Sequence, residues 1–503
     1  MTRSAVNSAG GGHSDRLGGH GHTRGRPHNR WLVLAVLAMA QLMVVLDATI
    51  VTIALPSAQK ALHFSTADRQ WVVTAYSLAF GSLLLLGGRL SDLLGRKRMF
   101  VFGLIGFASA SALGGAATGF LMLASARALQ GAFGAMLSPA ALSLVTTTFT
   151  DPHDRGKAFG IYGAVAGAGG AIGLILGGAL TQYLDWRWSL YVNDVLGFVA
   201  VVSALILLPA SVPERGVRLD WPGVLSVVGG LVCIVYGLSE ANTAGWSNPA
   251  TLAFLFVGVV LLCVFVAVER RADHPLLPLR VILNRNRGAA DLAFLISGIG
   301  TFGVFLFLTY YVQLTLRFPP FKAGLAFLPM VAILVVTSAY TNTVLSLRIG
   351  PRWIVATGMI VSAGGLTTFA QLGVHSTYIG GVVPGLAITG IGMGLIFGTA
   401  LNAATSRAAT HDAGVASALV NVGQQVGGSI GTALLNTLYA SAVTSYVAAH
   451  GTSSIAVAMT RGEDLAFWVG AGIFALGGVV SAMLFESGVL TPLPEGEAVA
   501  VAA

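Results

Sequence analysis

Long apolar blocks, separated by short polar segments, follow one another along this chain from Trp31 almost to its end. Each block is close to the ~20 residues that an α-helix needs to cross a bilayer. The pattern therefore predicts fourteen transmembrane helices, which we place at residues 31–55, 70–88, 99–118, 120–145, 157–180, 190–209, 221–240, 249–268, 289–313, 322–345, 353–372, 378–402, 413–440 and 465–485.

The composition supports lipid as the main solvent of this protein. Hydrophobic residues make up 55% of the 503 residues, charged residues make up only 10%, and the mean hydropathy is +0.79. A soluble domain carries about 25% charged residues, so a soluble fold of this size would lack polar surface. The 65 glycines suit membrane helices, which pack closely through small residues. We therefore expect an all-α integral membrane protein.

The remaining compositional features are weak signals for other functions. The net charge of +8 is expected of a membrane protein with basic cytoplasmic loops, so we predict no nucleic-acid partner. Cys233 and Cys263 lie inside apolar runs, where we interpret them as packing residues rather than redox or metal-binding groups. Residues 1–30 are rich in Gly, His and Arg and have no apolar run, so we predict a disordered cytoplasmic tail, not a signal peptide.

The basic residues predict the orientation of the chain in the membrane. If residue 1 is cytoplasmic, the cytoplasmic segments carry 21 of the 28 Lys and Arg residues, the outer segments carry 6, and Arg127 lies within a span. Cytoplasmic loops are enriched in Lys and Arg, so both termini are predicted to be cytoplasmic in a plasma-membrane protein. Arg69 and Arg461 belong to the six outer residues in this interpretation.

An internal repeat divides the chain. A shift of 258 residues aligns 154–158 with 412–416 and 169–173 with 427–431, although a sequence rich in Gly and Ala can also produce such matches by coincidence. The common shift predicts two six-helix halves with two helices inserted between them. The expected organisation is an N-terminal tail, an N-terminal half, two inserted helices, a cytoplasmic loop, a C-terminal half and a C-terminal tail, at residues 1–30, 31–210, 211–270, 271–288, 289–486 and 487–503.

The loop after the second span resembles the loop signature of the major facilitator superfamily. The residues that carry this resemblance are Gly88, Arg89, Asp92, Gly95, Arg96 and Lys97. The glycines permit a tight turn, and the acid can cap a helix of the other half or pair with its basic neighbours. We interpret the loop as a breakable cytoplasmic latch between the halves; the alternative is a solvated charge cluster that only orients the chain.

Two charged residues within spans resemble signatures of drug:proton antiporters in this superfamily. Asp47, in the first span, lies ~12 Å from the outer end of its helix, and Arg127, in the fourth span, lies ~10 Å from its outer end. The resemblance implies that these helices line a central cavity. Apolar surroundings favour the neutral acid and a nearby Arg favours the charged acid, so we predict that Asp47 couples transport to protons. A static ion pair is the alternative. We expect no other acid deep in a span.

Glycines in two later spans predict close helix packing. The fifth span resembles the glycine-rich antiporter signature through Gly163, Gly167, Gly169, Gly173 and Gly177. Leu174 stands where that signature has proline, a departure that leaves the direction of transport open. The thirteenth span repeats the spacing on one face, at Gly423, Gly427 and Gly431. We interpret both sets as a hinge or seal between helices.

Polar residues within other spans are candidates for a substrate cavity. These are Gln41, Thr49, Tyr76, Gln130, Tyr310, Tyr340, Asn342, Asn402, Asn421 and Gln424. Some related exporters of dications have a carboxylate in the tenth span, but the tenth span of this chain contains none. We therefore expect a neutral or monocationic amphipathic substrate.

The predicted function is proton-coupled export of amphipathic drug-like molecules by a fourteen-span major facilitator. The sequence contains no GxxxxGK[ST] loop and no cluster of His, Asp and Glu within a span, so we expect neither ATP use nor catalysis, and no cofactor other than protons. Two alternatives stay open: uptake of a nutrient or siderophore by symport, and a membrane sensor or lipid-handling protein on the same scaffold.

Overall fold

The computed structural model describes residues 30–66, 68–149, 151–209, 219–272, 275–277, 279–346, 348–405, 413–451 and 455–488. Helices account for most of these residues, because a backbone in lipid must satisfy its own hydrogen bonds. Residues 1–29 of the expected N-terminal tail, the segment at 210–218 and residues 489–503 of the expected C-terminal tail lie outside the described residues.

Helices stand at all fourteen predicted positions. Their bounds are α1 (Arg30–Leu62), α2 (Arg69–Leu94), α3 (Arg96–Gly115), α4 (Phe120–Thr148), α5 (Pro152–Tyr183), α6 (Trp188–Leu207), α7 (Trp221–Ala244), α8 (Pro249–Glu269), α9 (Leu279–Ile282), α10 (Arg285–Tyr310) continued by η1 (Tyr311–Thr315), α11 (Pro320–Ala326), α12 (Leu328–Tyr340) continued by η2 (Thr341–Leu345), α13 (Pro351–Phe369), η3 (Tyr378–Val382) continued by α14 (Val383–Thr405), α15 (Ala413–His450) and α16 (Ile455–Leu484). By length and composition, eleven of these helical units can cross a membrane.

Several helices extend past the apolar runs that predicted them. α1 continues to Leu62, α15 continues to His450, and α16 begins at Ile455, ten residues before its predicted start at 465. Backbone hydrogen bonding continues into the polar flanks, whereas the apolar run marks only the part that suits lipid. The tenth span is divided into α11 and α12, where Pro329 lies in the first turn of α12 and cannot donate a backbone hydrogen bond.

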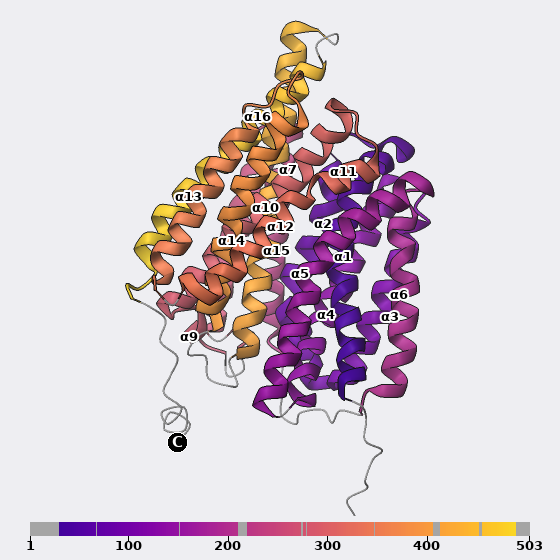
Figure 1. Cartoon of the computed structure of the whole chain (residues 1–503), viewed down its shortest axis with the longest axis vertical. Helices are drawn as coiled ribbons and strands as arrows, with labels where there is room; N and C mark the ends of the chain where they lie inside the picture. Colours follow the sequence, from indigo (N-terminus) through magenta and orange to yellow (C-terminus); the bar gives the residue numbers. More distant parts are fainter. Residues whose placement is uncertain are drawn as a thin grey trace, which may run out of the picture.

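The two halves have the same internal packing, which supports the predicted repeat. In the first half α1 packs on α5, α2 on α4, and α4 and α6 on α3. In the second half the equivalent pairs are α10 with α15, α12 with α14, α13 with α14 and α13 with α16. Figure 1 shows the halves side by side, α1–α6 in indigo to magenta and α10–α16 in rose to yellow. Two seams join them, α2 with α15 and α5 with α11.

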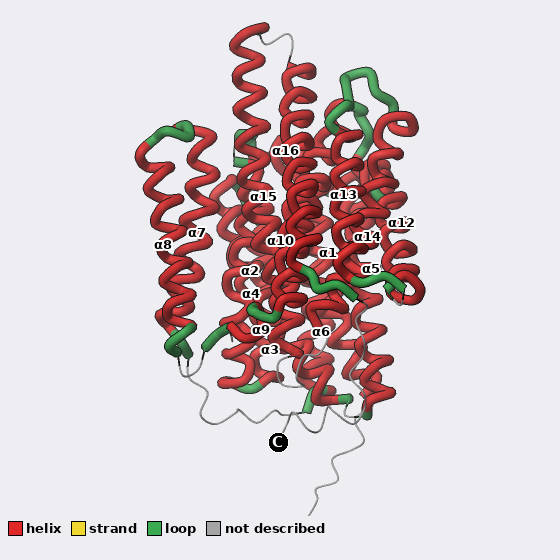
Figure 2. Tube along the Cα trace, turned by 90° about the vertical axis from the view of Figure 1, so that its left-hand side faces the viewer, coloured by secondary structure: helices red, strands yellow, loops and turns green. Residues whose placement is uncertain are grey.

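The inserted helices α7 and α8 form a pair at one edge of the bundle (Figure 2). α7 packs on α15 and α2, and so lies over the first seam. Gln70 of α2 donates to Ser239 Oγ at 2.6 Å, and Thr437 of α15 donates to the Leu238 carbonyl at 2.8 Å. One turn of α7 is therefore bonded to both halves.

Side-chain hydrogen bonds also join the halves directly. We call the end of the bundle where α1 stops and α2 starts the distal end, uppermost in Figure 1, and the opposite end the proximal end. At the distal end, Tyr310 donates to Gln59 Oε1 at 2.6 Å, and Gln313 donates to the Ile53 carbonyl at 2.9 Å. These bonds hold α10 and η1 against α1.

Candidate functional site

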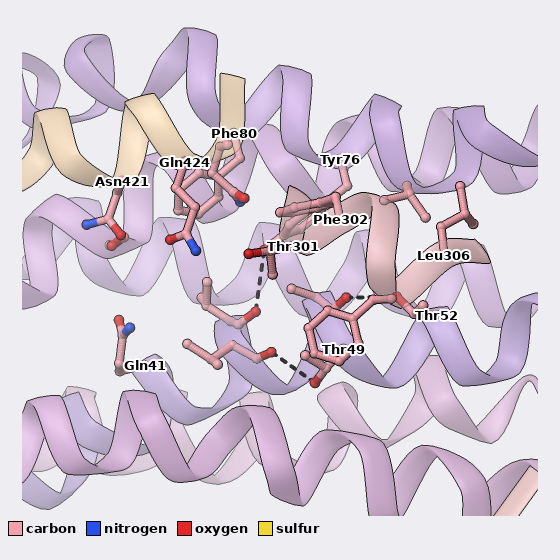
Figure 3. A pocket seen from close by; sticks show the side chains of 17 residues that line it. Gln41, Thr49, Thr52, Tyr76, Phe80, Thr301, Phe302, Leu306, Asn421 and Gln424 are labelled. Carbon is pink, nitrogen blue, oxygen red and sulfur yellow. Dashed lines mark hydrogen bonds between the residues drawn. The ribbon is translucent and has the colours of Figure 1, made fainter. Parts of the chain in front are cut away.

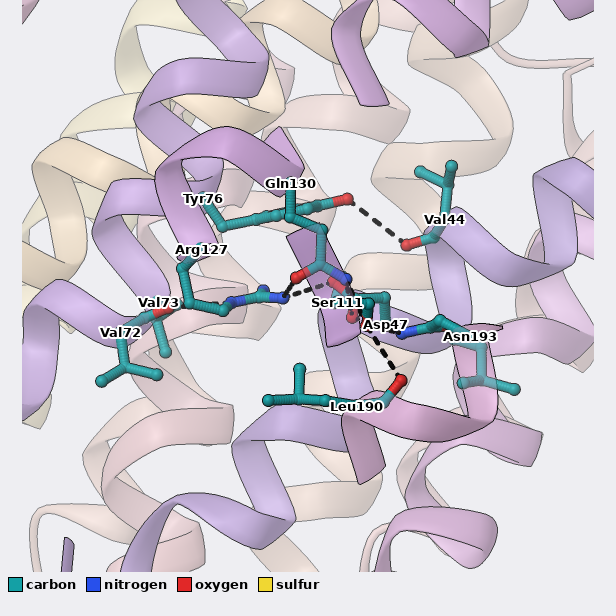
Figure 4. A network of polar contacts seen from close by, with 12 residues as sticks. Val44, Asp47, Val72, Val73, Tyr76, Ser111, Arg127, Gln130, Leu190 and Asn193 are labelled. Carbon is teal, nitrogen blue, oxygen red and sulfur yellow. Dashed lines mark hydrogen bonds and ion pairs between the residues drawn. The ribbon is translucent and has the colours of Figure 1, made fainter. Parts of the chain in front are cut away.

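Asp47 and Arg127 meet in a buried ion pair between α1 and α4. Arg127 Nη1 lies 2.6 Å from Asp47 Oδ2, and the two side chains are 2% and 0% exposed (Figure 4). The matching depths expected from the sequence agree with this contact. Breaking such a pair leaves one charge buried without a partner, which is costly, so these two charges stay together unless a proton neutralises the acid.

Amide side chains complete the shell around the carboxylate. Gln130 of α4 and Asn193 of α6 donate to Asp47 Oδ1 at 2.7 and 2.8 Å. Both amides also donate to Ser111 Oγ of α3 at 3.1 Å, and Ser111 donates to the Leu190 carbonyl at 2.9 Å. Hydrogen bonds to an ionised group are stronger than neutral ones, so this network stabilises the charged carboxylate. Four helices contribute to it.

The Arg127 guanidinium has further partners on α2. Its Nε donates to the Val72 carbonyl at 3.2 Å, and its Cζ lies 4.3 Å from the centre of the Tyr76 ring. A cation over an aromatic face is attracted by the ring, more strongly where water is excluded. α2 therefore contacts the charged group of Arg127 directly.

A cavity between the halves lies next to this network. It contains about 910 Å³ of free space, counting the part open to solvent, and is lined by α1, α2, α4, α10 and α15 (Figure 3). Its polar lining residues carry only hydroxyl and amide groups, and they are Gln41, Thr49, Thr52, Tyr76, Ser138, Thr301, Asn421, Gln424 and Gln425. Because Tyr76 also contacts Arg127, one ring connects the cavity with the ion pair.

The predicted cavity residues divide into two groups. Five line the cavity: Gln41, Thr49, Tyr76, Asn421 and Gln424. The other five are not among the residues that line this cavity: Gln130 belongs to the ion-pair network, Tyr310 bonds to Gln59 at the distal end, and Tyr340, Asn342 and Asn402 are exposed. Asn402 donates to Asn342 Oδ1 at 2.8 Å. A polar residue in an apolar run does not reveal which way its helix faces, so the sequence alone could not separate these two groups.

The sequence analysis missed Asn193 and Ser111. Both lie in spans that the apolar runs predicted correctly, but a lone Asn or Ser in such a run carries no signal of its partner. Gln130 was singled out, and its position three residues after Arg127 places both on one face of α4. The spacing of Gln130 from Arg127 is the sequence feature that could have predicted its place in the ion-pair network.

The predicted latch residues lie at the proximal end. Gly95 has φ = 93°, a left-handed conformation that favours glycine and turns the chain between α2 and α3. Asp92 lies 3.8 Å from Arg96 within the same loop, and Lys97 donates to the Leu208 carbonyl of the same half at 2.6 Å. Arg89 donates to the Pro275 carbonyl, in the segment after the inserted helices. A latch from Asp92 to the C-terminal half stays a prediction, as does any role of Gly88.

The predicted glycine faces are sites of close helix contact. A Cβ at Gly173 would lie 2.0 Å from Thr49 Oγ1 of α1, and one at Gly427 would lie 1.9 Å from the Leu295 carbonyl of α10. The neighbouring positions of the two faces, Gly169, Gly177, Gly423 and Gly431, approach the same two helices. The packing of Gly163 and Gly167 lies outside the described residues.

Asp47 is not the only acid that is buried within a helix of the described residues. Glu463 lies in α16 and is 3% exposed. Glu463 lies outside the span predicted at 465–485, because the helix begins ten residues earlier, at Ile455. Arg69, expected as an outer-loop charge, is the first residue of α2 and only 1% exposed.

Comparison with known proteins assigns this architecture to a family, since residues 37–432 match the family model of the Major Facilitator Superfamily. The chain belongs to the major facilitator superfamily. As a major facilitator, it is a multi-pass membrane transporter.

Among curated major facilitators, the chain is 46% identical over 468 residues to the puromycin resistance protein pur8 of Streptomyces alboniger, an alignment that covers 92% of this chain and 93% of the relative. It is 38% identical over 408 residues to the cephamycin export protein CmcT of Amycolatopsis lactamdurans, and this alignment covers 80% of this chain and 84% of the relative. The POT family transporter PepTSo has a TM-score of 0.65 with 17% identity, covering 90% of this chain and 97% of that one. This last similarity concerns the fold alone.

Proposed function

We propose that this major facilitator exports amphipathic drug-like or antibiotic molecules across the plasma membrane in exchange for protons. The observation that carries the proposal is the buried Asp47–Arg127 pair beside an uncharged cavity, with Tyr76 contacting both. Relatives of which the alignments cover most of the length are named for resistance to, or export of, antibiotics, which supports export rather than uptake.

Protonation of Asp47 is the proposed coupling step. A proton on the carboxyl removes its attraction for Arg127 and turns an acceptor of three hydrogen bonds into a weaker one. Arg127 then keeps its contacts with Val72 and Tyr76, both on α2, and is free to move with that helix. Because α2 forms one seam between the halves, the charge of one acid biases the arrangement of the whole bundle.

We infer the orientation in the membrane from the distribution of basic residues. With both termini cytoplasmic, the distal end is outer and the proximal end is cytoplasmic. The hydrogen bonds between the halves at the distal end then close the outer side, and the structure corresponds to an inward-facing arrangement. A proton gradient and the membrane potential both favour inward proton movement; the potential contributes about 2.3 kcal/mol per charge at 100 mV.

The cavity lining favours neutral or monocationic substrates. None of the described residues that line the cavity carries a charge, so the lining offers hydroxyl and amide partners and apolar surface. A dication would lose its hydration there without gaining a carboxylate partner, which is unfavourable. Tight, proton-competed binding of a dication that survives Asp47→Asn would contradict this assignment. We expect no ATP, nucleic acid or cofactor to take part.

The decisive experiment measures transport in everted vesicles with an imposed pH gradient. Wild-type protein is expected to accumulate a fluorescent amphipathic dye in the vesicles and to raise drug resistance when it is expressed. Asp47→Asn and Arg127→Ala are each expected to abolish gradient-driven accumulation, while Asn402→Ala, an exposed amide variant, retains it. Dye movement in the opposite direction would identify a symporter, and wild-type protein without dye movement or resistance would favour a sensor or lipid-handling role.

A further inference from the structure

A second buried cation lies where α2 meets the C-terminal half. Arg69 begins α2, yet its guanidinium extends into a box of aromatic rings from the other half, 4.1 Å from the centre of Tyr310, 4.4 Å from Tyr439 and 5.8 Å from Phe307. Its Nε donates to Asn436 Oδ1 at 3.1 Å. A cation at a helix N-terminus opposes the helix dipole, so stability of α2 does not account for this placement.

Glu463, in α16, is a buried acid that interacts with this cation. The carboxylate is 3% exposed, its Oε1 atom has no hydrogen-bond partner, and it interacts electrostatically with Arg69. Arg69 Nη2 likewise has no hydrogen-bond partner, so the two charges attract each other without closing a bonded ion pair. An unpaired buried carboxylate is costly in free energy, and a buried acid takes up a proton when no cation compensates its charge.

Among the described residues, two phenols and one further carboxylic acid interact with or adjoin Glu463. Tyr439 of α15 and Tyr311 of η1 interact with it electrostatically, and Asp464 is its neighbour in α16. Phenols stay neutral between pH 5 and 8, so they do not compete for protons there. Asp464 interacts with Arg461 of its own helix and is the matched acid against which Glu463 can be compared.

We propose that Glu463 is a second proton-binding site and that it controls closure of the distal end through Arg69. Arg69 belongs to the N-terminal half and Glu463 to the C-terminal half, so the two part when the distal end opens. The closed arrangement favours the charged acid, because the guanidinium is near. The open arrangement favours the protonated acid, because the guanidinium has withdrawn. By linkage, a proton on Glu463 favours opening.

The inference rests on the proposed function for its orientation, which makes the distal end the outer one. A proton taken from the acidic outer side would then hold the transporter open for release of substrate. This role is separate from that of Asp47, since the two acids lie on different halves and interact with different arginines. Arg69 acts as a positioning residue that transmits the charge of Glu463 to α2.

The test follows opening of the distal end as a function of pH. Spin labels at Lys60→Cys and Ser445→Cys, both exposed distal positions on opposite halves, report the ratio of open to closed molecules in reconstituted full-length protein with Cys233 and Cys263 replaced by Ala. The background carries Asp47→Asn to remove the first proton site. If one proton is linked to opening, the base-ten logarithm of the open-to-closed ratio changes by about one per pH unit. The open form is favoured at low pH.

The variants separate a proton site from a packing role. Glu463→Gln is expected to reduce the slope to about zero and to favour the open form at every pH. Asp464→Asn is expected to keep the slope of about one. Arg69→Gln, which removes the cation instead, is also expected to abolish the pH response. An unchanged slope in Glu463→Gln overturns the inference while leaving the role of Asp47 intact; loss of Asp47-dependent transport is judged separately in the vesicle assay.

Discussion

At the scale of single residues, the central feature is a carboxylate that accepts hydrogen bonds from three side chains on two helices. Arg127, Gln130 and Asn193 all donate to Asp47. Each of these bonds stabilises the charged form of the acid, so the proton affinity of Asp47 depends on how many of them are kept. Movement of α4 against α6 would break part of this set of bonds.

Removal of one amide tests this dependence. Asn193→Ala takes away one bond to the carboxylate, and a hydrogen bond to a charged group contributes about 1.5–3 kcal/mol. The charged form loses that stabilisation, so the pH midpoint of substrate-driven proton exchange is expected to move upward by about one to two units. Proton flux in proteoliposomes over a pH series measures the midpoint. An unchanged midpoint with normal activity would show that Asn193 only fills space.

The sequence predicted Asp47 and Arg127 because a charge inside an apolar run is rare and costly. It could not predict Asn193 or Ser111, since uncharged polar residues are common in membrane helices and their facing is set by tertiary packing. Glu463 was missed for another reason. Its polar neighbourhood resembles a loop, but α16 already begins at Ile455 and packing buries the acid.

At the scale of elements, the positions of the helices could be predicted from the apolar runs, but the residues at which they end could not. An apolar run has one stable form in a bilayer, so every predicted span is a helix. Where a helix leaves the lipid, backbone bonding and packing decide its length, and α15 and α16 extend about ten residues beyond the predicted limits. Glycine spacing predicted close contacts correctly, because only the absence of a side chain permits them.

Gly427→Ala tests the contact between α15 and α10. Its Cβ would lie 1.9 Å from the Leu295 carbonyl, a backbone atom that moves only if the helices separate. Overpacking of this kind costs about 1–3 kcal/mol, so a lower melting temperature of the purified protein is expected. Gly472→Ala is the matched control on α16, because nothing lies within 4 Å of its Cβ position. Equal melting temperatures for the two variants would contradict the close contact.

At the scale of the whole molecule, two halves with equivalent packing meet along two seams that are themselves equivalent, α2 with α15 and α5 with α11. In the first seam, the hydroxyl groups of Ser77 and Ser429 lie 2.9 Å apart. Alternating access requires such contacts to form and break in each cycle. A covalent bond across the seam is therefore expected to stop the cycle.

A cysteine pair tests this expectation. Ser77→Cys with Ser429→Cys, in a protein whose two native cysteines are replaced by Ala, is expected to form a disulfide under oxidation, because the side chains are within reach. Dye export should fall to background and return with reductant. Thr181→Cys with Ser189→Cys is the control: their hydroxyl groups lie 3.2 Å apart within one half, and export should persist. Continued export by the oxidised first pair would contradict rocking of the halves.

The inserted helices make the two seams unequal toward the bilayer. Among the described residues, α7 packs on the α2–α15 seam and α8 packs on α7, and no such pair covers the α5–α11 seam. The outer side chains of α8 are apolar. A hydrophobic compound dissolved in the membrane therefore meets two additional helices in front of the α2–α15 seam, but not in front of the α5–α11 seam. The inserted pair covers one of the two seams between the described halves, so the two flanks of the bundle present different surfaces to lipid.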